Sequence, residues 1–243
     1  MGIQKGAVLA GGTGTRLRPY TFAINKHLLP VFDRPMVAFP IGTLQGIGIR
    51  EVGVVTGTEH LESFRQVLGD GSRYGVTLTL IGQDGPKGVA HALLQTESFF
   101  RGSKVVAILG DDLFEPVTLS PEVLGDDNAH VFVAPATDPQ HVAIAELDTS
   151  GRIRAIEDHP AHPRSDQMVV GLYVFPPDVF QVIRSVSPSA RRELEIADVM
   201  NWYIRNDRLH PIFTDRFVAD AGTEDGFKRA TLYAARKSGA RGS

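Results

Sequence analysis

The sequence predicts an α/β fold with a mostly parallel sheet. Short apolar runs such as residues 7–10 are typical of strands that are buried on both faces. These runs alternate with segments whose apolar residues recur at helical spacing, which indicates right-handed strand–helix–strand units. From His130 onward, short strands follow one another at close spacing, so an antiparallel insertion is expected there.

The first half of the chain supplies the parallel part of a Rossmann-like sheet flanked by helices. Ligands of such a sheet bind at the carboxyl ends of its strands. Pro35 suits the first turn of a helix, because the N–H that proline lacks is not needed there. The expected strands are residues 7–10, 52–56, 76–81 and 104–109, and the expected helices are residues 35–48, 59–68 and 89–100.

The second half supplies the antiparallel insertion and the closing helices. Residues 236–243 are expected to fray, as chain ends commonly do. The insertion is expected to contain strands at residues 131–136, 142–147, 152–156 and 168–175. Helices at residues 177–187 and 194–206, a short strand near Phe217 and a helix at residues 222–236 are expected to follow.

Composition excludes several classes of function. The 25 Lys and Arg against 28 Asp and Glu give a net charge of −3, which argues against a nucleic-acid or membrane partner. The absence of Cys excludes disulfides, thiolate nucleophiles and cysteine zinc sites, and fits a reducing cytoplasm. No apolar run approaches the roughly 18 residues of a membrane span, and the N-terminus lacks the apolar core of a signal peptide. We therefore expect a cytoplasmic protein.

The loop after the first strand carries the clearest functional signal. Gly11, Gly12 and Gly14 leave room for backbone N–H groups to converge on an anion. Arg16 and Lys26 add two cations that can bind phosphate oxygens. A bare glycine loop can also be no more than a tight turn, but the two cations favour anion binding.

This loop matches neither of two common phosphate-binding motifs. A Walker A loop needs Gly-Lys-Ser/Thr after a glycine and four residues, and the chain has no such string. The dinucleotide fingerprint, Gly-x-Gly-x-x-Gly, needs a third glycine three residues after the second one, whereas Leu17 stands three residues after Gly14.

Two acidic positions are candidates for metal binding. Asp111 follows an apolar strand and a glycine, so it is expected at the carboxyl edge of the sheet, whereas Asp112 fits a solvated turn. Asp220 precedes Ala-Gly-Thr at the start of a helix, where it can be either a metal ligand or the helix N-cap. His159 and His162 lie between prolines and are interpreted as surface histidines rather than a metal pair.

The chain resembles the sugar-phosphate nucleotidylyltransferases, most closely the short form of the glucose-1-phosphate thymidylyltransferases. The resemblance rests on residues 9–17 (LAGGTGTRL) and 25–31 (NKHLLPV), and it extends from about residue 6 to 231. It implies the nucleotide-diphospho-sugar transferase fold in a single domain, 1–243. Within that domain, about 1–125 would bind the nucleotide and about 126–235 the sugar.

The resemblance also implies a reaction. A nucleoside triphosphate, dTTP, is joined to a sugar 1-phosphate, glucose 1-phosphate, and gives a nucleotide sugar and pyrophosphate with Mg²⁺ as cofactor. Two alternatives stay open: the same chemistry on a modified sugar, a cyclitol or a non-sugar phosphate, or a catalytically weak nucleotide-sugar-binding protein. Members of the family are commonly homo-oligomers.

The resemblance assigns roles residue by residue. Gln83, which otherwise fits a surface loop, and Gly88 would contact the base, because an amide both donates and accepts hydrogen bonds. The implied catalytic residues are Arg16, Lys26 and Asp111, and the implied Mg²⁺ ligands are Asp111 and Asp220. The implied nucleotide-binding residues are Leu9, Gly11, Gly12, Gly14, Thr15, Gln83 and Gly88, and the implied acceptor-binding residues are Ala143, Glu157, His159, Gly171 and Arg191.

The chain departs from the family around the acceptor and the base, but not at the metal. His159 stands where the family usually has Lys, Ala143 where it has Gly, and His91 where Gln or Glu is common. Pro86 and Lys87 replace a small loop. The chain ends about twenty residues after Asp220, so we expect it to lack the helical segment with which long forms build a regulatory site.

Overall fold

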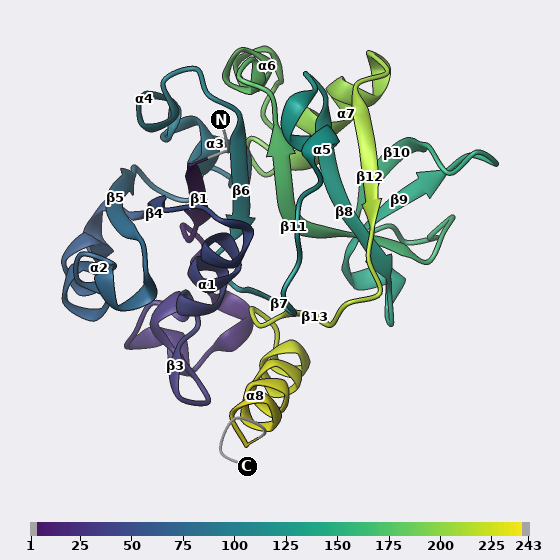
Figure 1. Cartoon of the computed structure of the whole chain (residues 1–243). Coiled ribbons are helices and arrows are strands. Elements are labelled where there is room, and N and C mark those ends of the chain that lie inside the picture. The colour runs from purple at the N-terminus through teal and green to yellow at the C-terminus, as the bar shows by residue number, and fades with distance from the viewer. Residues whose placement is uncertain (1–3, 240–243) are drawn as a thin grey trace. The chain divides into compact units, whose positions relative to one another are not determined.

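The structure, a computed structural model, describes residues 4–239, which form two compact units (Figure 1). The loop unit comprises residues 4–86, 108–118 and 217–239. The insertion unit comprises residues 87–107 and 119–216. The predicted single domain with a division near residue 125 stays a prediction.

The loop unit contains the predicted parallel strands. Strand β4 lies between β1 and β5, and both pairs are parallel, with Lys5 opposite Glu51 and Glu51 opposite Thr77. Apolar side chains of β1 and β4 are fully buried, as the continuous apolar runs predicted. The elements are β1 (Lys5–Leu9), α1 (Ala38–Ile47), β4 (Glu51–Gly57), α2 (Leu61–Leu68) and β5 (Thr77–Gln83).

The predicted start of the first helix is wrong. Pro35 lies in β3 (Arg34–Pro35), which pairs with β2 (Pro30–Val31) in a small hairpin, and α1 begins only at Ala38. A further backbone hydrogen bond, from the Met36 N–H to the Leu29 carbonyl at 2.9 Å, lengthens this hairpin. The helical spacing of the apolar residues does not reveal this hairpin pairing.

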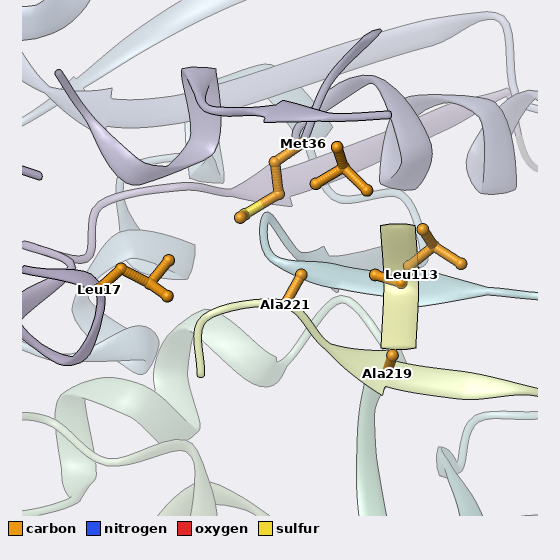
Figure 2. Close-up of a cluster of buried hydrophobic side chains, with 7 residues drawn as sticks. Leu17, Met36, Leu113, Ala219 and Ala221 are labelled. Carbon is orange, nitrogen blue, oxygen red and sulfur yellow. The ribbon is translucent and has the colours of Figure 1, made fainter. Parts of the chain in front are cut away.

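The third part of the loop unit comes from the end of the chain. β7 (Asp112–Phe114) pairs antiparallel with β13 (Val218–Asp220), which confirms the strand expected near Phe217, whereas β7 was not expected. Helix α8 (Glu224–Gly239) follows, so residues 236–239 are helical rather than frayed, and residues 240–243 lie outside the described residues. Figure 2 shows the buried cluster that joins these segments, which is formed by Leu17, Val31, Met36, Leu113, Ala219, Ala221 and Ala230.

The insertion unit contains the predicted antiparallel strands. β11 pairs antiparallel with β8, and β10 with β9. The chain passes from this unit to the loop unit within β6 (Val105–Leu109). The strands and helices are α5 (Pro121–Gly125), β8 (Ala129–Pro135), β9 (Ala143–Leu147), β10 (Ile153–Asp158), β11 (Gln167–Phe175), α6 (Val179–Ser185) and α7 (Ile196–Arg205).

Two features of the insertion unit differ from the sequence prediction. The helix expected over residues 89–100 is broken into α3 (Val89–Leu94) and α4 (Glu97–Phe100), where the Thr96 hydroxyl donates to the Leu93 carbonyl at 2.6 Å. Strand β12 (Leu209–Phe213) pairs parallel with β8 and was not expected, since a proline in its middle argues against a strand.

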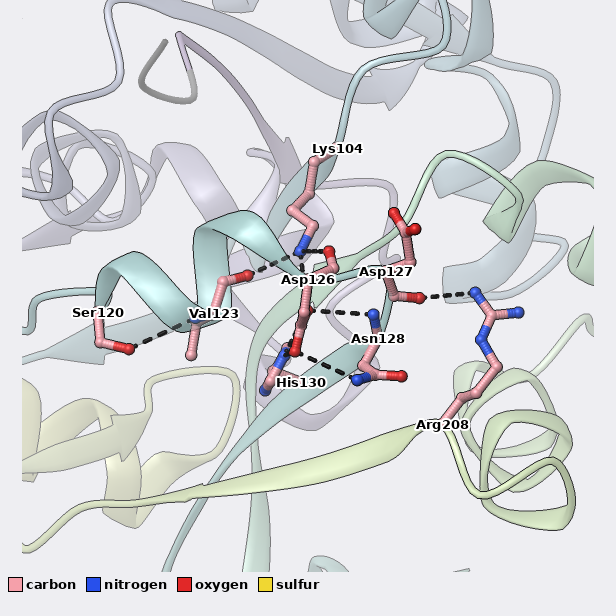
Figure 3. A network of polar contacts seen from close by, with 8 residues as sticks. All are labelled: Lys104, Ser120, Val123, Asp126, Asp127, Asn128, His130 and Arg208. Carbon is pink, nitrogen blue, oxygen red and sulfur yellow. Dashed lines mark hydrogen bonds and ion pairs between the residues drawn. The ribbon is translucent and has the colours of Figure 1, made fainter.

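A polar network joins β6, α5 and β8 in the insertion unit (Figure 3). The Lys104 ammonium donates to the Val123 carbonyl at 2.7 Å and to the Asp126 carboxylate at 3.1 Å. His130 Nε2 lies 2.9 Å from the same carboxylate, and the Asn128 N–H donates to it at 3.1 Å. Burial alone would raise the pKa of Asp126, but the hydrogen bonds from His130, Asn128 and Lys104 together lower it to about 2.

Among residues 4–239, no helix is both long enough and apolar enough to span a bilayer.

This network predicts a pH-dependent contribution of Asp126 to stability. Asp126→Asn should lower the free energy of unfolding at pH 7 by about 2 kcal/mol, because charge-assisted hydrogen bonds are lost. The pKa of Asp126 is lower in the folded than in the unfolded chain, so this contribution is present above about pH 4 and is lost as the pH falls towards 2. Urea unfolding of both proteins from pH 7 to pH 2 measures the difference.

The neighbouring Asp127 provides a matched control. Its side chain is exposed, and its backbone carbonyl rather than its carboxylate accepts from Arg208 at 2.7 Å. Asp127→Asn should change the free energy of unfolding by less than about 0.5 kcal/mol. An Asp126→Asn difference that stayed constant down to pH 2 would contradict the assigned pKa.

Candidate active site

The glycine loop of the loop unit encloses the side chain of Lys26. A Cβ added at Gly12 would lie 3.1 Å from Lys26 Cε, and one added at Gly14 would lie 2.9 Å from Lys26 Cβ. Gly14 also has φ +68°, a conformation that favours glycine, and its carbonyl accepts from Thr21 Oγ1 at 2.7 Å. The glycines are therefore required for close packing against Lys26.

Lys26 forms a buried ion pair with Asp111. Its Nζ contacts Asp111 Oδ2, and the two residues are only 9% and 8% exposed. Burial alone would raise the pKa of Asp111, but the charge of Lys26 lowers it to about 2, so the carboxylate is ionised near neutral pH. The adjacent His27 is buried, and burial together with the charge of Lys26 lowers its pKa to about 3, so its imidazole is neutral.

Asp220 and Arg16 form a second, more open pair. Arg16 Nη2 lies 3.5 Å from Asp220 Oδ2, and both side chains are partly exposed. Burial and the neighbouring charge of Asp111 raise the pKa of Asp220. The cap of α8 is supplied by Thr223, whose Oγ1 accepts from the Gly226 N–H at 3.1 Å, whereas Asp220 lies in β13. Of the two interpretations of Asp220, the N-cap is thus excluded.

Three carboxylates converge in this unit. Asp111, Asp112 and Asp220 each place one oxygen within 4.8 Å of the others, and Asp112 lies opposite Asp220 in the β7–β13 pair. A Cβ added at Gly222 would collide with the Asp111 carboxylate and lie 2.8 Å from that of Asp220. Oxygen ligands of this number and spacing fit a hard divalent cation.

Asp112 corrects the sequence analysis. It was expected in a solvated turn, but it is 6% exposed and begins β7. The burial comes from the pairing of β7 with β13, whose segments are about a hundred residues apart in the chain. Only the adjacency of two acids after a buried strand pointed to this position.

The predicted nucleotide-binding residues fall into two groups. Gln83 ends β5, is 2% exposed, and its amide packs against Gly11, so it is not a surface glutamine. Leu9 accepts from the Gly110 N–H at 2.9 Å, and Thr15 begins a short helical turn after the loop. Gly88 belongs to the insertion unit, where a Cβ would stand 2.8 Å from the Leu194 backbone N, so its contact with a base stays a prediction.

The insertion unit brings three of the five predicted acceptor residues to one cavity. Glu157, His159 and Arg191 line a cavity of about 500 Å³. Ala143 and Gly171 do not line it; Ala143 is the strand partner of Asp158, and Gly171 is buried in β11. The cavity is completed by Ile156, Asp158, Ser189, Ala190, Glu195, Ala197, Asp198 and Asn201.

Asp158 is a residue of this cavity that the sequence analysis missed. Its carboxylate lies 2.8 Å from His159 Nδ1 and 3.3 Å from Arg191 Nη2. Arg191 Nη2 also lies 3.0 Å from Glu195 Oε1, so the Arg191 guanidinium and the His159 imidazole already contact carboxylates. His162 is exposed, as expected of a surface histidine, and does not line the cavity. The only signal for Asp158 was its position beside two predicted residues.

The sequence of this chain is similar to those of proteins that transfer nucleotidyl groups. A family model described as nucleotidyl transferase matches residues 5–237. A glucose-1-phosphate thymidylyltransferase of Actinoplanes sp. is 40% identical over 238 residues, which cover 95% of this chain and 78% of that protein. The enzyme of the same name from Neisseria meningitidis is 35% identical and covers 95% and 82% of the two chains.

Solved structures support the fold. A Bacillus anthracis protein described as a glucose-1-phosphate thymidylyltransferase, in complex with a sucrose, matches with a TM-score of 0.88 and 37% identity over 95% of this chain and 94% of that chain. A UDP-glucose pyrophosphorylase with UDP-glucose matches with a TM-score of 0.81 and covers 97% and 99% of the two chains, but at 22% identity it supports the fold alone. The predicted fold class is thereby confirmed.

The close approach at Gly222 predicts the effect of one methyl group. Gly222→Ala should lower turnover about 100-fold, because the added carbon displaces the carboxylates of Asp111 and Asp220. A steady-state assay of pyrophosphate release, combined with thermal melting, measures the effect on catalysis and on folding.

Gly42 supplies the control. It lies within α1 and a Cβ there would meet nothing within 4 Å, so Gly42→Ala should keep full turnover and stabilise the helix by about 0.5–1 kcal/mol. A Gly222→Ala protein with unchanged turnover would show that the carboxylates do not need their observed spacing.

Proposed function

This chain belongs to the nucleotidyl transferase family, and we propose that it transfers a thymidylyl group from dTTP to glucose 1-phosphate. One observation carries the proposal: two cations beside the glycine loop, Arg16 and Lys26, contact a cluster of three carboxylates. This combination suits phosphates on one side and a divalent metal on the other.

The proposed reaction needs positioning rather than a covalent intermediate. An oxygen of the sugar phosphate attacks the α-phosphorus, a new P–O bond forms, and the bond to pyrophosphate breaks with its electrons on the leaving group. Arg16 and Lys26 bind the phosphates, and the glycine loop orients them through its backbone N–H groups. Asp111 and Asp220, with Asp112 beside them, would hold Mg²⁺, which supplies positive charge against the developing negative charge.

Recognition of the base is proposed for Gln83. Its buried amide lies against Gly11, within reach of the loop that would hold the triphosphate. An amide can donate to and accept from the imide edge of thymine or uracil. A base that cannot form hydrogen bonds with this buried amide leaves it unpaired and binds poorly. Purine triphosphates should therefore be poor donors.

Recognition of the acceptor is proposed for the cavity of the insertion unit. Arg191 would bind the phosphate, while Glu157 accepts from sugar hydroxyls. A modified sugar or cyclitol phosphate is a second candidate, because His159, which replaces the usual Lys, is paired with Asp158. The presence of Arg16, Lys26, Asp111 and Asp220 in one site argues against a protein that only binds nucleotide sugars.

A substrate panel tests this function. Pyrophosphate release should be fastest with dTTP or UTP, and at least about 100-fold slower with ATP or GTP. Glucose 1-phosphate, its 2-amino derivative and a cyclitol phosphate should be compared at saturating dTTP. Similar rates with GTP and dTTP would refute the role of Gln83. If no pair of triphosphate and acceptor phosphate released pyrophosphate, the proposed activity would be refuted.

Removal of a carboxylate charge tests the metal centre. Asp111→Asn and Asp220→Asn should each lower turnover by about two or more orders of magnitude, because an amide keeps the shape but loses the charge that holds the ion. Turnover is measured over a range of Mg²⁺ concentrations. Asp70→Asn, in an exposed turn of the same unit, is the control and should stay within about twofold.

Removal of the Arg191 guanidinium should change only the Michaelis constant for the sugar phosphate. Arg191→Ala should raise KM for the sugar phosphate at least tenfold and leave KM for dTTP unchanged, because a charge-assisted contact worth about 1.5–3 kcal/mol is lost. Arg192→Asn is the neighbouring control, since Arg192 does not line the cavity and Asn tolerates its φ of +61°. An equal rise in both Michaelis constants would contradict a role restricted to the acceptor.

A further inference from the structure

Each cation expected to bind phosphate contacts a carboxylate expected to bind metal. Lys26 is paired with Asp111 in the buried part of the site, and Arg16 lies 3.5 Å from Asp220 in its more exposed part. The site is therefore closed by its own ion pairs. A ligand that takes one member of a pair therefore leaves the other member without its partner.

The charges of the site make the two ligands dependent on each other. Three carboxylates and two cations leave a net charge of about −1. A divalent metal alone would take Asp111 and leave the Lys26 ammonium buried beside a second cation. A triphosphate alone would take Lys26 and Arg16 and leave its negative charge facing bare carboxylates. Uncompensated buried charges cost several kcal/mol, so each ligand alone binds weakly.

We propose that metal and triphosphate enter by exchanging these partners. The metal takes the carboxylates of Asp111 and Asp220 from Lys26 and Arg16, and the phosphates take the two released cations. Lys26 thus acts as the counter-ion of Asp111 in the free protein and as a phosphate ligand in the loaded one. The inference rests on the proposed function, and it adds that metal and nucleotide bind with positive cooperativity.

The packing of Lys26 allows this exchange without a change of fold. Its stem is held between Gly12 and Gly14, and a Cβ added at Gly12 would lie 3.2 Å from Nζ. The ammonium therefore lies beside the backbone of the loop that would hold the phosphates. Nζ would therefore need little displacement to exchange Asp111 for a phosphate bound at that loop.

Metal binding without nucleotide tests the proposal. Free Mn²⁺ is measured by electron paramagnetic resonance during titration of the wild type and of Lys26→Gln, which removes the charge and keeps a hydrogen-bond donor. Lys26→Gln should bind Mn²⁺ roughly tenfold or more tightly than the wild type. Lys237→Gln is the matched control, because it removes a lysine paired with Glu115 at 2.9 Å on α8, and its Mn²⁺ affinity should equal that of the wild type.

A measurement on the wild type keeps the proposal testable if Lys26→Gln does not fold. The rate of reductive methylation of each lysine is followed by mass spectrometry as Mn²⁺ is added without nucleotide. Methylation of Lys26 should accelerate severalfold as the metal displaces it from Asp111, and that of Lys237 should stay constant. A Lys26 rate that does not respond while Mn²⁺ binds would overturn the exchange.

The outcomes separate this inference from the proposed function. Equal Mn²⁺ affinities of wild type and Lys26→Gln, both lost in Asp111→Asn, would overturn the exchange and leave the metal centre intact. Mn²⁺ binding that persists unchanged in Asp111→Asn would overturn the metal centre as well. Tighter binding in Lys26→Gln that Asp111→Asn abolishes supports both.

Discussion

The buried ion pair between Lys26 and Asp111 is the interaction on which the candidate site depends. A charge in a protein interior is tolerated only with a partner, so neither residue can be placed without the other. Gly12 and Gly14 leave space for the lysine stem, and the Gly110 N–H ties the segment before Asp111 to Leu9 at 2.9 Å. The glycine loop is thus a packing requirement of this pair as well as the proposed binding surface for anions.

The second constraint is the pairing of two very short strands. β7 and β13 have three residues each, yet they place Asp112 opposite Asp220 and fix the distance of both from Asp111. The buried cluster around Leu113 and Ala219 stabilises this pair, and α8 covers it. The proposed metal centre is therefore built from segments that are distant in sequence and held together by apolar packing, which keeps the carboxylates close despite their mutual repulsion.

The parts of the fold that were predictable are those with a local signal. The apolar runs of β1, β4 and β6 and the glycines after β1 each specify a conformation within a few residues, so strands, loop and Asp111 were found. The burial of Asp112 and the formation of strand β12 depend on strand partners far away in the chain, which the local pattern did not specify. The hairpin at Pro35 pairs with residues 30–31 nearby, and its residues were assigned instead to the start of a helix. Asp158 was missed for the same reason, since its role follows from Arg191, 33 residues away. The other assigned site roles stay predictions.

In the proposed exchange, Asp111 and Asp220 are paired with Lys26 and Arg16 in the free protein and with the metal in the loaded one. Anomalous diffraction from crystals of this protein grown with Mn²⁺ and a non-hydrolysable dTTP analogue tests that claim most directly. If the exchange occurs, a single manganese peak should lie within about 2.5 Å of carboxylate oxygens of both Asp111 and Asp220, and Lys26 Nζ should contact a phosphate oxygen. A manganese peak away from these carboxylates, with Lys26 still on Asp111, would contradict it.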